Sequence, residues 1–341
     1  MTTSKHDPLV SVIVPVYNGA EYVGQALESA LCQTYPHLEV LAIDDGSNDG
    51  SLEVLQLYAA KDSRVRVLRQ PNGGVASARN RCIEEARGEL IAPLDADDLW
   101  QPTKIERQVR RLLEAGDATG FVYCWWAWID ERSAILDRSP SWMVEGEAFE
   151  ALLQINFTGN ASVPLFRKRC VVEAGGYDPT LAAAGAGGCE DWELVLRIAN
   201  RYEVVVVPEI LLGYRRLKGS MSTSCNTMWR SKEMVIRQMH ELRPDVGNKV
   251  WKDSNRQFAL YLAGSSFWSG RIFEAIRWGL RSGWSLGLAV APHVLRMLVS
   301  RRRSKGAIGT MVPNETIHSK DIPGPLLPYD RIYSFLPRQR T

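Results

Sequence analysis

The chain has 341 residues, of which 45% are apolar and 23% are charged. That length is enough for one large hydrophobic core with an appendage, because single cores stop growing near ~250–300 residues. The formal net charge of +2 gives no whole-protein positive field, so nucleic acid is excluded as an expected partner.

The first hundred residues alternate between strand and helix patterns. Continuous β-branched and apolar runs predict buried strands, and apolar residues at helical spacing predict helices. Beginning with a strand and then alternating, the predicted elements are 10–16, 21–33, 38–43, 51–60, 65–68, 75–86 and 89–94. This alternation predicts a parallel sheet with right-handed crossovers, in which ligands bind at the carboxyl ends of the strands.

The rest of the chain is less regular. We expect an aromatic-rich strand at 121–129, a helix at 190–200, a short strand at 204–207, and helical stretches at 228–240 and 252–282. From residue 301 the sequence is rich in Pro, Gly and Arg with little periodicity, which predicts a loose tail.

Charge distribution and cysteine spacing give expectations about the compartment. After residue 280, ten Lys and Arg stand against three Asp and Glu. With the apolar stretch inside 285–305, this favours peripheral contact with an anionic membrane, and a helix packed on the main domain is the alternative. The six cysteines form no C-x-x-C pair, and the N-terminus has no apolar leader. We therefore expect a cytoplasmic protein, with attachment to the inner face of the membrane.

Three carboxylates lie within four residues directly after the fourth predicted strand, at Asp95, Asp97 and Asp98. Their mutual repulsion is costly unless a cation neutralises it. Hard oxygen ligands suit Mg²⁺ or Mn²⁺, which also bind diphosphate oxygens. A solvated Asp-rich turn is the alternative, and the position at the end of a buried strand favours the cation.

Two further loops follow strands in the first half. Asp44 and Asp45 end the second strand, where a carboxylate can accept an N–H from a nucleobase edge; helix capping with a glycine turn is the alternative. Gly73 and Gly74 precede a helix that carries Arg79, so this helix start can receive anionic groups. An ordinary loop with a surface arginine is the alternative there.

A fourth candidate is the run from Gly188 to Glu193, which holds Glu190 and Asp191. Acidic residues are favoured at a helix start by the helix dipole, so capping alone could explain them. The glycines that precede them indicate a mobile loop of the kind that closes over active sites.

Together these segments resemble the inverting family-2 glycosyltransferases with the GT-A fold, over about residues 9–222. The motifs that carry the resemblance occur in the family's order, at 14–18, 44–47, 72–80, 94–98 and 190–191. It implies an α/β fold with a mostly parallel central sheet flanked by helices. The expected division is a catalytic domain at 1–225, with a nucleotide-binding half at about 9–100 and an acceptor half at about 101–225, then a helical extension at 226–300 and the basic tail at 301–341.

The resemblance also implies roles for individual residues. Tyr17 would stack on the base, Asp45 would hydrogen-bond it, and Pro15 would shape the same pocket. The residues expected to bind the nucleotide sugar are Pro15, Tyr17, Asn18, Asp44, Asp45, Asn72, Arg79, Asp95, Asp97 and Arg216. Asp97 and Asp98 are the expected ligands of Mn²⁺ or Mg²⁺, although the sequence does not decide among the three aspartates.

Catalysis is expected from Asp191, as general base on the acceptor hydroxyl, with Glu190 beside it. The helix dipole should keep Asp191 ionised at neutral pH. The implied reaction moves one sugar from a nucleotide-diphosphate donor, expected to be a UDP-sugar, to a glycan or lipid-linked acceptor in polysaccharide or cell-surface glycan synthesis.

The sequence departs from the family's pattern at Leu217, where a histidine often follows a Tyr-Arg pair. Arg216 or Lys218 could neutralise the diphosphate instead. The Q-x-x-R-W motif of processive synthases is absent, as are long apolar spans, which favours transfer of a single sugar. A nucleotidyltransferase and a catalytically inactive nucleotide-sugar-binding module are the competing interpretations.

Overall fold

The computed structural model describes residues 7–217 and 224–283. Its first half contains four parallel strands, β1 (Val10–Val16), β2 (Leu38–Asp44), β3 (Val65–Arg69) and β4 (Leu90–Pro93). Every residue of β1 and β2 is buried, because helices cover both faces of the sheet and only continuous apolar runs suit such strands. The predicted strand–helix alternation is confirmed.

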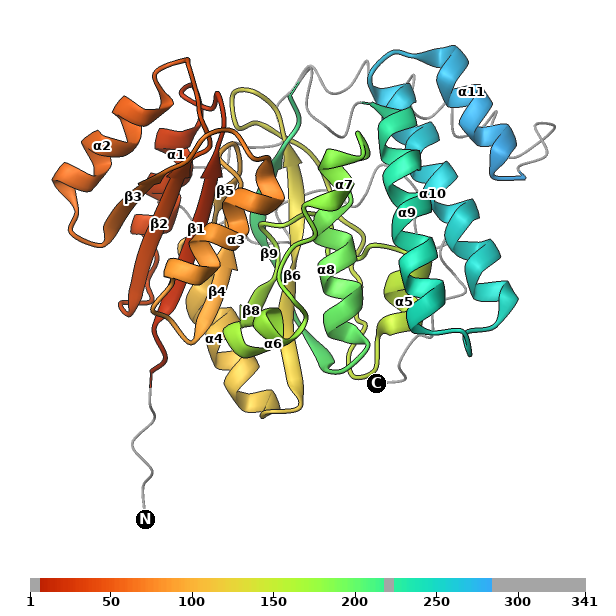
Figure 1. The fold of residues 1–341 in the computed structure, drawn as a ribbon, viewed down its shortest axis with the longest axis horizontal. Coiled ribbons are helices and arrows are strands. Elements are labelled where there is room, and N and C mark those ends of the chain that lie inside the picture. The colour runs from red at the N-terminus through yellow and green to blue at the C-terminus, as the bar shows by residue number, and fades with distance from the viewer. Residues whose placement is uncertain (1–6, 218–223, 284–341) are drawn as a thin grey trace.

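The helices between these strands are α1 (Val23–Leu31), α2 (Ser51–Lys61) and α3 (Val75–Glu85). Helix α3 packs on β1 and β2, while α2 lies beside β3 (Figure 1). In β1 and β2 the parallel register pairs Val16 with Asp44, so the loops that follow the two strands begin side by side.

The complete sheet is mixed, with the order β3-β2-β1-β4-β8-β6-β9-β5 and β7 paired to β6. Strand β8 (Leu165–Arg167) runs antiparallel to β4 and to β6 (Thr119–Ile129), which in turn is parallel to β9 (Glu203–Arg215). Short antiparallel strands complete it, β5 (Leu99–Trp100) on β9 and β7 (Ile135–Arg138) on β6. The expected α/β class is confirmed.

Strand β9 is much longer than the predicted 204–207. The apolar pattern stops at Pro208 and Glu209, yet the pairing with β6 resumes at Ile210. A proline has no N–H for the ladder, so the two residues are left out as a bulge while the strand continues. This continuation brings Tyr214 and Arg215 to the carboxyl-end edge of the sheet.

Helices account for most of the remaining chain. The five in the middle of the chain are α4 (Lys104–Ala115), α5 (Phe149–Gln154), α6 (Lys168–Glu173), α7 (Thr180–Ala183) and α8 (Glu190–Ala199). Three more follow, α9 (Cys225–Leu242), α10 (Asn248–Trp268) and α11 (Ile272–Arg281). The predicted stretch at 252–282 is thus two helices, because Gly270 has a φ of +77° that an α-helix does not admit.

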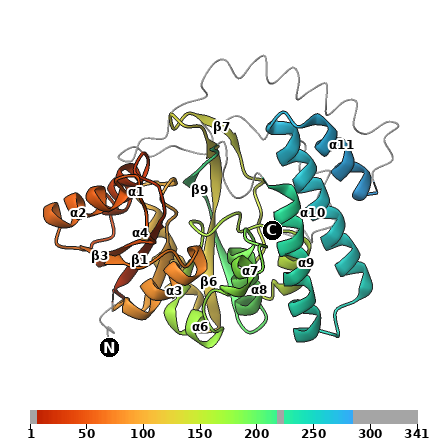
Figure 2. The same ribbon diagram turned by 45° about the horizontal axis from the view of Figure 1, so that its top comes forward.

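The C-terminal helices stack against the part of the sheet domain that holds α5 and α8 (Figures 1 and 2). Helix α9 contacts α8, and α10 contacts α5, α9 and α11. No helix within 7–217 or 224–283 is long and apolar enough to cross a membrane. The domain boundaries drawn from the sequence stay predictions, and the segments 285–305 and 301–341 lie outside the described residues.

Candidate active site

Strands β1 and β4 separate toward their carboxyl ends, and this is where a ligand is expected to bind. Their pairing ends at Ile13 and Pro93, and Pro15 follows in β1 without an N–H to extend the ladder. From β1 the chain continues to β2 and β3 on one side and then returns to β4 on the other side of β1. Open α/β sheets bind ligands at such a reversal of strand order. The loops after β1 and after β4 therefore flank the predicted site.

Tyr17 and Asn18 are the first residues after β1. The Tyr17 side chain is 55% exposed, which leaves a ring face available for stacking. Asn18 has a φ of +50°, and its backbone N–H donates to Ser47 Oγ at 3.0 Å. Its Oδ1 accepts the N–H of Asn48 at 2.9 Å, so the loops after β1 and β2 hold each other in place.

Asp45 is buried and fixes the loop that precedes α3. Its Oδ1 accepts hydrogen bonds from Gln70 Nε2 and the Gly73 N–H, both at 2.8 Å, and its Oδ2 accepts from the Gly74 N–H at 2.9 Å. A carboxylate has about four lone-pair sites, so at most one is left for a nucleobase. Sequence reasoning assigned Asp45 to the base and did not foresee this anchoring.

Asp44 is completely buried at the end of β2. Its Oδ1 accepts the Ser47 N–H at 3.0 Å, while Oδ2 lies 3.5 Å from Nε of the exposed Arg69 and accepts no hydrogen bond. Asn72 is exposed, and its backbone crosses directly over Gly46, where a Cβ would lie 2.8 Å from the Asn72 nitrogen. The loop can close over β2 only because residue 46 is glycine.

Arg79 is buried, which contradicts the alternative of an ordinary surface arginine. Its Nη2 donates to Asp95 Oδ1 at 2.5 Å, and its guanidinium lies 5.0 Å from the centre of the Tyr177 ring. Burial lowers the pKa of Arg79, but Asp95 and Tyr177 outweigh this and the net shift is upward. The residue is a permanent cation attached to the Asp95 end of the β4 loop.

Asp97 is half-buried and stands between Asp95 and Asp98 in this loop. Burial and the neighbouring charge of Asp95 raise its pKa to about 6, against the lowering effects of its own backbone N–H and of Arg215. Asp95 is positioned by its N–H, which donates to Ser162 Oγ at 2.9 Å. A divalent cation between these carboxylates would remove the repulsion that raises the pKa.

Asp98 is buried and hydrogen-bonded on both oxygens. Its Oδ2 accepts from Asn160 Nδ2 and Ser162 Oγ, both at 2.6 Å, and its Oδ1 accepts the Arg215 N–H at 3.0 Å. Burial, together with the charges of Asp97 and Asp95, raises its pKa well above the ordinary value. Because three protein donors occupy its oxygens, Asp98 is less suited to hold a metal than Asp95 and Asp97.

Arg215 is a buried residue of the candidate site that the sequence did not single out. Its buried guanidinium donates to the carbonyl of Asp97 at 2.7 Å, to that of Asp130 at 2.9 Å and to Ser133 Oγ at 3.1 Å. A further donation reaches Gln25 Oε1 at 3.0 Å. The side chain therefore ties the loop after β4 to the turn between β6 and β7 and to α1. In the sequence, only the alternation of faces along β9 distinguishes Arg215 from Arg216.

Arg216 points away from Arg215 and lies over the Trp128 ring at 4.4 Å. It is half-buried, and Tyr261 on α10 lies within reach of its charge. The neighbouring Tyr214 has its pKa raised by burial and by the charges of Tyr261, Asp98 and Asp191. These couplings place β9, α8 and α10 around one polar region; Lys218 lies outside the described residues.

Asp191 stands in the first turn of α8. Its Oδ1 accepts the Trp192 N–H at 2.7 Å. Burial raises its pKa to about 7, although Arg79 and that backbone hydrogen bond lower it. The expectation of a fully ionised carboxylate at neutral pH is therefore wrong, because desolvation outweighs the helix dipole and the nearby cation.

Glu190 is buried and faces the loop before α8. Its Oε2 accepts the Gly188 N–H at 2.8 Å, whereas its Oε1 is buried without a hydrogen-bond partner in the described structure. Gly188 has a φ of +112°, and a Cβ on this residue would lie 2.3 Å from Met228 Sδ. The glycine thus lets this loop pass closely under α9, and Glu190 closes the turn.

Asp95 and Asp97 are the carboxylates of this loop whose oxygens have fewer protein donors than those of Asp98. Within 7–217 and 224–283, no three His, Cys, Asp or Glu side chains converge as a ready-made metal cage. Sites that bind a nucleotide together with its metal need few protein ligands, because phosphates and waters supply the rest. The raised pKa of Asp97 is the observation that supports this fit.

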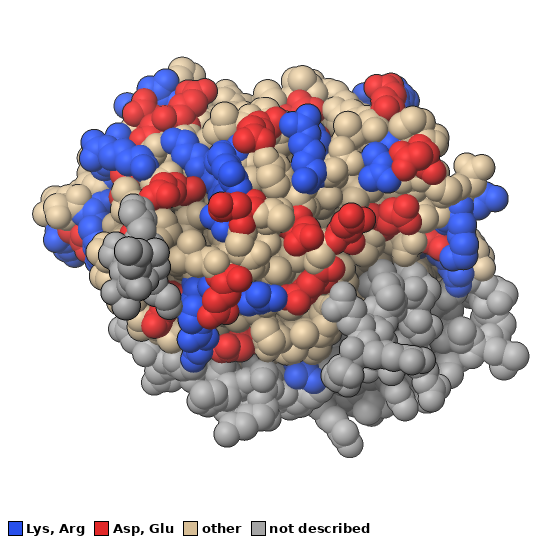
Figure 3. All heavy atoms as spheres, turned by 90° about the horizontal axis from the view of Figure 1, so that it is seen from below, with Lys and Arg blue, Asp and Glu red and all other residues tan. Residues whose placement is uncertain are grey.

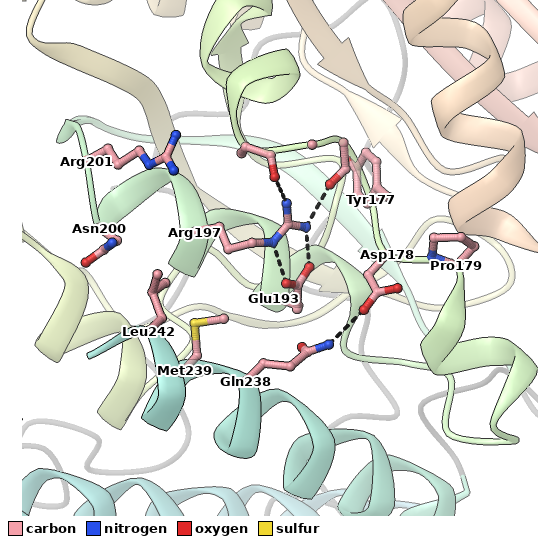
Figure 4. Close-up of a pocket in the computed structure, with 13 residues that line it drawn as sticks. Tyr177, Asp178, Pro179, Glu193, Arg197, Asn200, Arg201, Gln238, Met239 and Leu242 are labelled. Carbon is pink, nitrogen blue, oxygen red and sulfur yellow. Dashed lines mark hydrogen bonds and ion pairs between the residues drawn. The ribbon is translucent and has the colours of Figure 1, made fainter. Parts of the chain in front are cut away.

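A cavity of about 430 Å³ lies on the other side of α8, between α8, α9 and the loop before α7 (Figure 4). Its wall includes Tyr177, Asp178, Arg197 and Gln238, and none of the predicted site residues. Arg197 is paired with Glu193, and Asp178 accepts a hydrogen bond from Gln238 Nε2 at 2.9 Å. The cavity is a separate space behind the Tyr177 ring.

Comparison with protein families identifies the first part of the chain. Residues 11–162 match the model described as glycosyl transferase family 2. The chain is 42% identical over 115 residues to a putative teichuronic acid biosynthesis glycosyltransferase, TuaG, of Bacillus subtilis, covering 33% of this chain and 46% of that protein. Over 107 residues it is 42% identical to the chondroitin synthase of Pasteurella multocida, covering 31% of this chain and 11% of that protein. The chain thus spans less than half the length of these curated relatives.

Solved structures extend the likeness to most of the chain. A mannosyltransferase from Pyrobaculum calidifontis, in complex with GDP-Man and Mn²⁺, superposes with a TM-score of 0.54 at 18% identity, covering 88% of this chain and 81% of its own. TarS of S. aureus, residues 1–349 in complex with UDP-GlcNAc, gives a TM-score of 0.53 at 15% identity, covering 82% and 93%. At these identities the likeness shows the fold, and the GT-A arrangement is confirmed.

Proposed function

We propose that this chain, whose residues 11–162 belong to glycosyl transferase family 2, transfers one sugar from a nucleotide-diphosphate donor to a hydroxyl group of a glycan or lipid-linked acceptor. We further propose that the reaction inverts the anomeric centre and requires a divalent cation. The observation that carries the proposal is that Asp191 lies near the loop after β4, since the charges of Arg79 and Asp95, which pair with each other, both act on it.

The donor would bind across the carboxyl ends of β1, β2 and β4. The exposed ring of Tyr17 is suited to stack on a base, since every base has an apolar face. One free acceptor site on Asp45 could take an N–H from the base edge while the rest of the carboxylate holds the Gln70–Gly74 loop. Asp44, Asn18 and Asn72 would then shape the pocket by fixing these loops.

Asp95 and Asp97 would hold Mn²⁺ or Mg²⁺ with the diphosphate. The cation, when bound, supplies positive charge that stabilises the leaving nucleoside diphosphate. Arg79 orients Asp95 and adds a fixed cation beside it, while Arg215 holds the Asp97 carbonyl and so keeps the loop in one conformation. Arg216 would neutralise a phosphate or a charged acceptor, and the charge effects of both Arg216 and Asp191 on Tyr261 support this role.

Asp191 would act as the general base. Its pKa of about 7 is matched to accepting a proton at neutral pH, because a base near the operating pH is both deprotonated and basic enough. As it takes the acceptor hydroxyl proton, the acceptor oxygen bonds to C1 of the sugar. The C1–O bond to the diphosphate breaks on the opposite face, so nucleoside diphosphate leaves and the configuration inverts.

The identity of the donor needs a direct screen, because two solved structures of this fold hold different nucleotides, GDP-Man in one and UDP-GlcNAc in the other. We propose a UDP-sugar for this chain. Thermal unfolding would be followed with UDP-, GDP- and dTDP-sugars, each with Mn²⁺ and with chelator. A shift that requires both a UDP-sugar and the metal is expected.

Turnover would then be tested as slow hydrolysis of the preferred donor, and the released sugar would be examined by NMR at the first time points. Inverted configuration of the fresh product is expected. Binding without any hydrolysis or transfer would support an inactive binding module instead. Formation of a nucleotide sugar from a sugar phosphate would support a nucleotidyltransferase.

A further inference from the structure

Helix α11 carries an unusual concentration of exposed apolar side chains. Eleven large hydrophobic residues are exposed among the described residues, and four of them lie on this ten-residue helix. Phe273 is 89% exposed and Leu280 is 55% exposed, while Ile272 and Ile276 are each 45% exposed. Exposed hydrophobic residues are ordinary when scattered, but a cluster marks a surface that contacts something.

The four side chains share one face of the helix. At 3.6 residues per turn, positions 272, 273, 276 and 280 fall within an arc of about 100°. The opposite side of α11 is fixed to the protein by Trp278, which is buried and lies 5.2 Å from the Trp229 ring of α9. Since Trp278 anchors the helix, the apolar arc cannot turn inward without breaking this contact.

Positive charge borders the arc. Helix α11 and the residue before it contain three arginines, Arg271, Arg277 and Arg281, against the single acid Glu274. Arg277 and Arg281 follow the arc directly around the helix, and both are exposed. Arg271 pairs with Glu274 at 3.1 Å, and Arg281 lies 3.8 Å from Glu233 on α9. An apolar stripe with arginines at its edge is the pattern of a helix that lies in a lipid surface.

The position of α11 in the molecule agrees with this pattern. Figure 1 shows α11 on the side toward which β1 and β6 point, which is the side of the predicted site. The opposite side, seen from below in Figure 3, shows Lys and Arg interspersed with Asp and Glu over its described part. Mixed charge of that kind is the ordinary solvated surface of a protein.

We propose that α11 lies in the surface of an anionic phospholipid bilayer, with Phe273, Ile276 and Leu280 among the acyl chains and Arg277 at the headgroups. This contact would turn the carboxyl-end edge of the sheet toward the membrane. It is a contact of the described helix itself, independent of the basic segment at 285–305, and it does not depend on the transferase reaction.

A lipid surface explains the face better than a second copy of the chain does. A symmetric dimer across α11 would set the same patch of each copy against the other. Arg271 and Arg281 have Glu274 and Glu233 as acidic neighbours, but the Arg277 side chains at the edge of the arc would approach one another across such a dimer. Anionic headgroups, in contrast, neutralise each arginine while the apolar side chains leave water.

The test is co-sedimentation of the full-length protein with vesicles of equal parts phosphatidylcholine and phosphatidylglycerol, and with vesicles of phosphatidylcholine alone. Phe273→Glu should lower the partition coefficient on the mixed vesicles by about tenfold or more, because it places a charge in the apolar arc. Arg277→Gln should lower it about fivefold on mixed vesicles only, since one arginine near an anionic surface contributes that much.

The matched control is Val172→Glu on α6. Val172 is 58% exposed, and α6 lies at the bottom of Figure 1, away from α11. This variant adds the same charge to another exposed apolar position, so it should sediment with vesicles as the unaltered protein does. Circular dichroism and thermal unfolding of all variants should match the unaltered protein, because each substitution is at the surface.

Three results would overturn the proposal. One is unchanged sedimentation of Phe273→Glu while combined replacement of Arg301, Arg302 and Arg303 by glutamine abolishes it, which would assign binding to the tail. Another is equal loss in Val172→Glu. The third is a dimer in sedimentation velocity without vesicles that Phe273→Glu dissociates, which would identify α11 as an interface between copies.

Discussion

The loops after β2 and β4 both carry adjacent aspartates, yet their carboxylates are in opposite states. In the β2 loop Asp45 accepts three hydrogen bonds, and Asp49 accepts from the Ala20 and Ser51 N–H groups. In the β4 loop, burial and Asp95 leave Asp97 with a raised pKa of about 6. The difference teaches that Asp45 holds its loop together through several donors, whereas in the described structure Asp97 has a hydrogen bond only from its own N–H and has room for a ligand.

The same contrast divides neighbours within the β4 loop. Asp98 is satisfied by Asn160, Ser162 and the Arg215 N–H, and Asp97 is not satisfied in this way. Asp191 resembles Asp97, because burial leaves it with a raised pKa despite the cation of Arg79. We therefore expect substitutions of Asp97 and Asp191 to affect mainly the chemistry. Substitutions of Asp45 and Asp98 should affect the stability of the fold.

The largest effect is expected from Asp191→Asn. The change keeps the size and the hydrogen bond to the Trp192 N–H but removes the basic oxygen, so turnover should fall by ~10²–10⁴-fold. Donor affinity, measured by calorimetry with Mn²⁺, should change by less than about threefold, which is a free-energy change of about RT. The reason is that the proposed donor contacts come from the loops after β1, β2 and β4 and not from Asp191. Glu190→Gln is the control and should be milder, because Glu190 closes the Gly188 turn. Loss of donor binding in proportion to turnover would make Asp191 a structural cap.

Asp97→Asn should have the next largest effect. Loss of a residue that only hydrogen-bonds a metal ligand lowers metal affinity about 10–100-fold. Asp97→Asn removes the charge of a proposed ligand itself, so metal affinity should fall by about 100-fold or more. Titration of Mn²⁺ in the presence of nucleoside diphosphate would measure it. Equal donor affinity with Mn²⁺ and with chelator in the unaltered protein would remove the metal from the proposal.

Asp98→Asn should instead change stability. The new amide NH₂ group would face the protein donors that now bind a carboxylate oxygen of Asp98. Each buried polar group left without a partner costs about 1–3 kcal/mol. Thermal or urea unfolding would show the loss, whereas Asp97→Asn should leave the apo protein as stable or more so because it removes a repelled charge. The opposite ranking would return Asp98 to the role of metal ligand.

Asp45→Ala should affect both properties. Three donors of the Gln70–Gly74 loop lose their acceptor, and nucleotide affinity should fall by about 1–3 kcal/mol. Calorimetry with nucleoside diphosphate and an unfolding curve on the same sample would separate the two. If unfolding shifts and affinity does not, Asp45 anchors the loop and does not touch the base.

The smallest effect is a dependence on pH. Because the pKa of Asp191 is raised to about 7, the base is increasingly protonated below that pH. kcat/KM, which reports the free enzyme, should fall about tenfold for each pH unit below 7 and level off above it. Asp191→Asn should lose this limb. A limb centred near the ordinary value of an aspartate would mean that the site is better solvated than the structure indicates.

Residues whose neighbours are close in sequence were predictable, and those held by distant partners were not. The strands β1 and β2 follow from continuous apolar runs, and the aspartates at their ends follow from chain direction. The saturation of Asp98 depends on Asn160 and Arg215, which are 62 and 117 positions away. No local pattern encodes such distances, and for the same reason Arg215 was overlooked in favour of its neighbour Arg216.

The bulge at Pro208 was missed because a proline usually ends a strand. The sheet compensates by leaving two residues out, and the pairing of β9 with β6 then continues to Arg215. The pKa of Asp191 was misjudged because the helix dipole is visible in a sequence and burial is not. Local electrostatics therefore predicted an ionised carboxylate where burial raises the pKa of Asp191 to about 7.

The span of β9 has a consequence for how this protein can be divided. The family match ends at residue 162, yet β9 lies between β6 and β5 in the sheet, and its Arg215 secures the loop of Asp97 and Asp98. A fragment cut at that limit would expose an unpaired edge of β6 and leave Asp98 without one of its donors. The unit that can be exchanged between proteins, by recombination or by engineering, must therefore extend at least through Arg215.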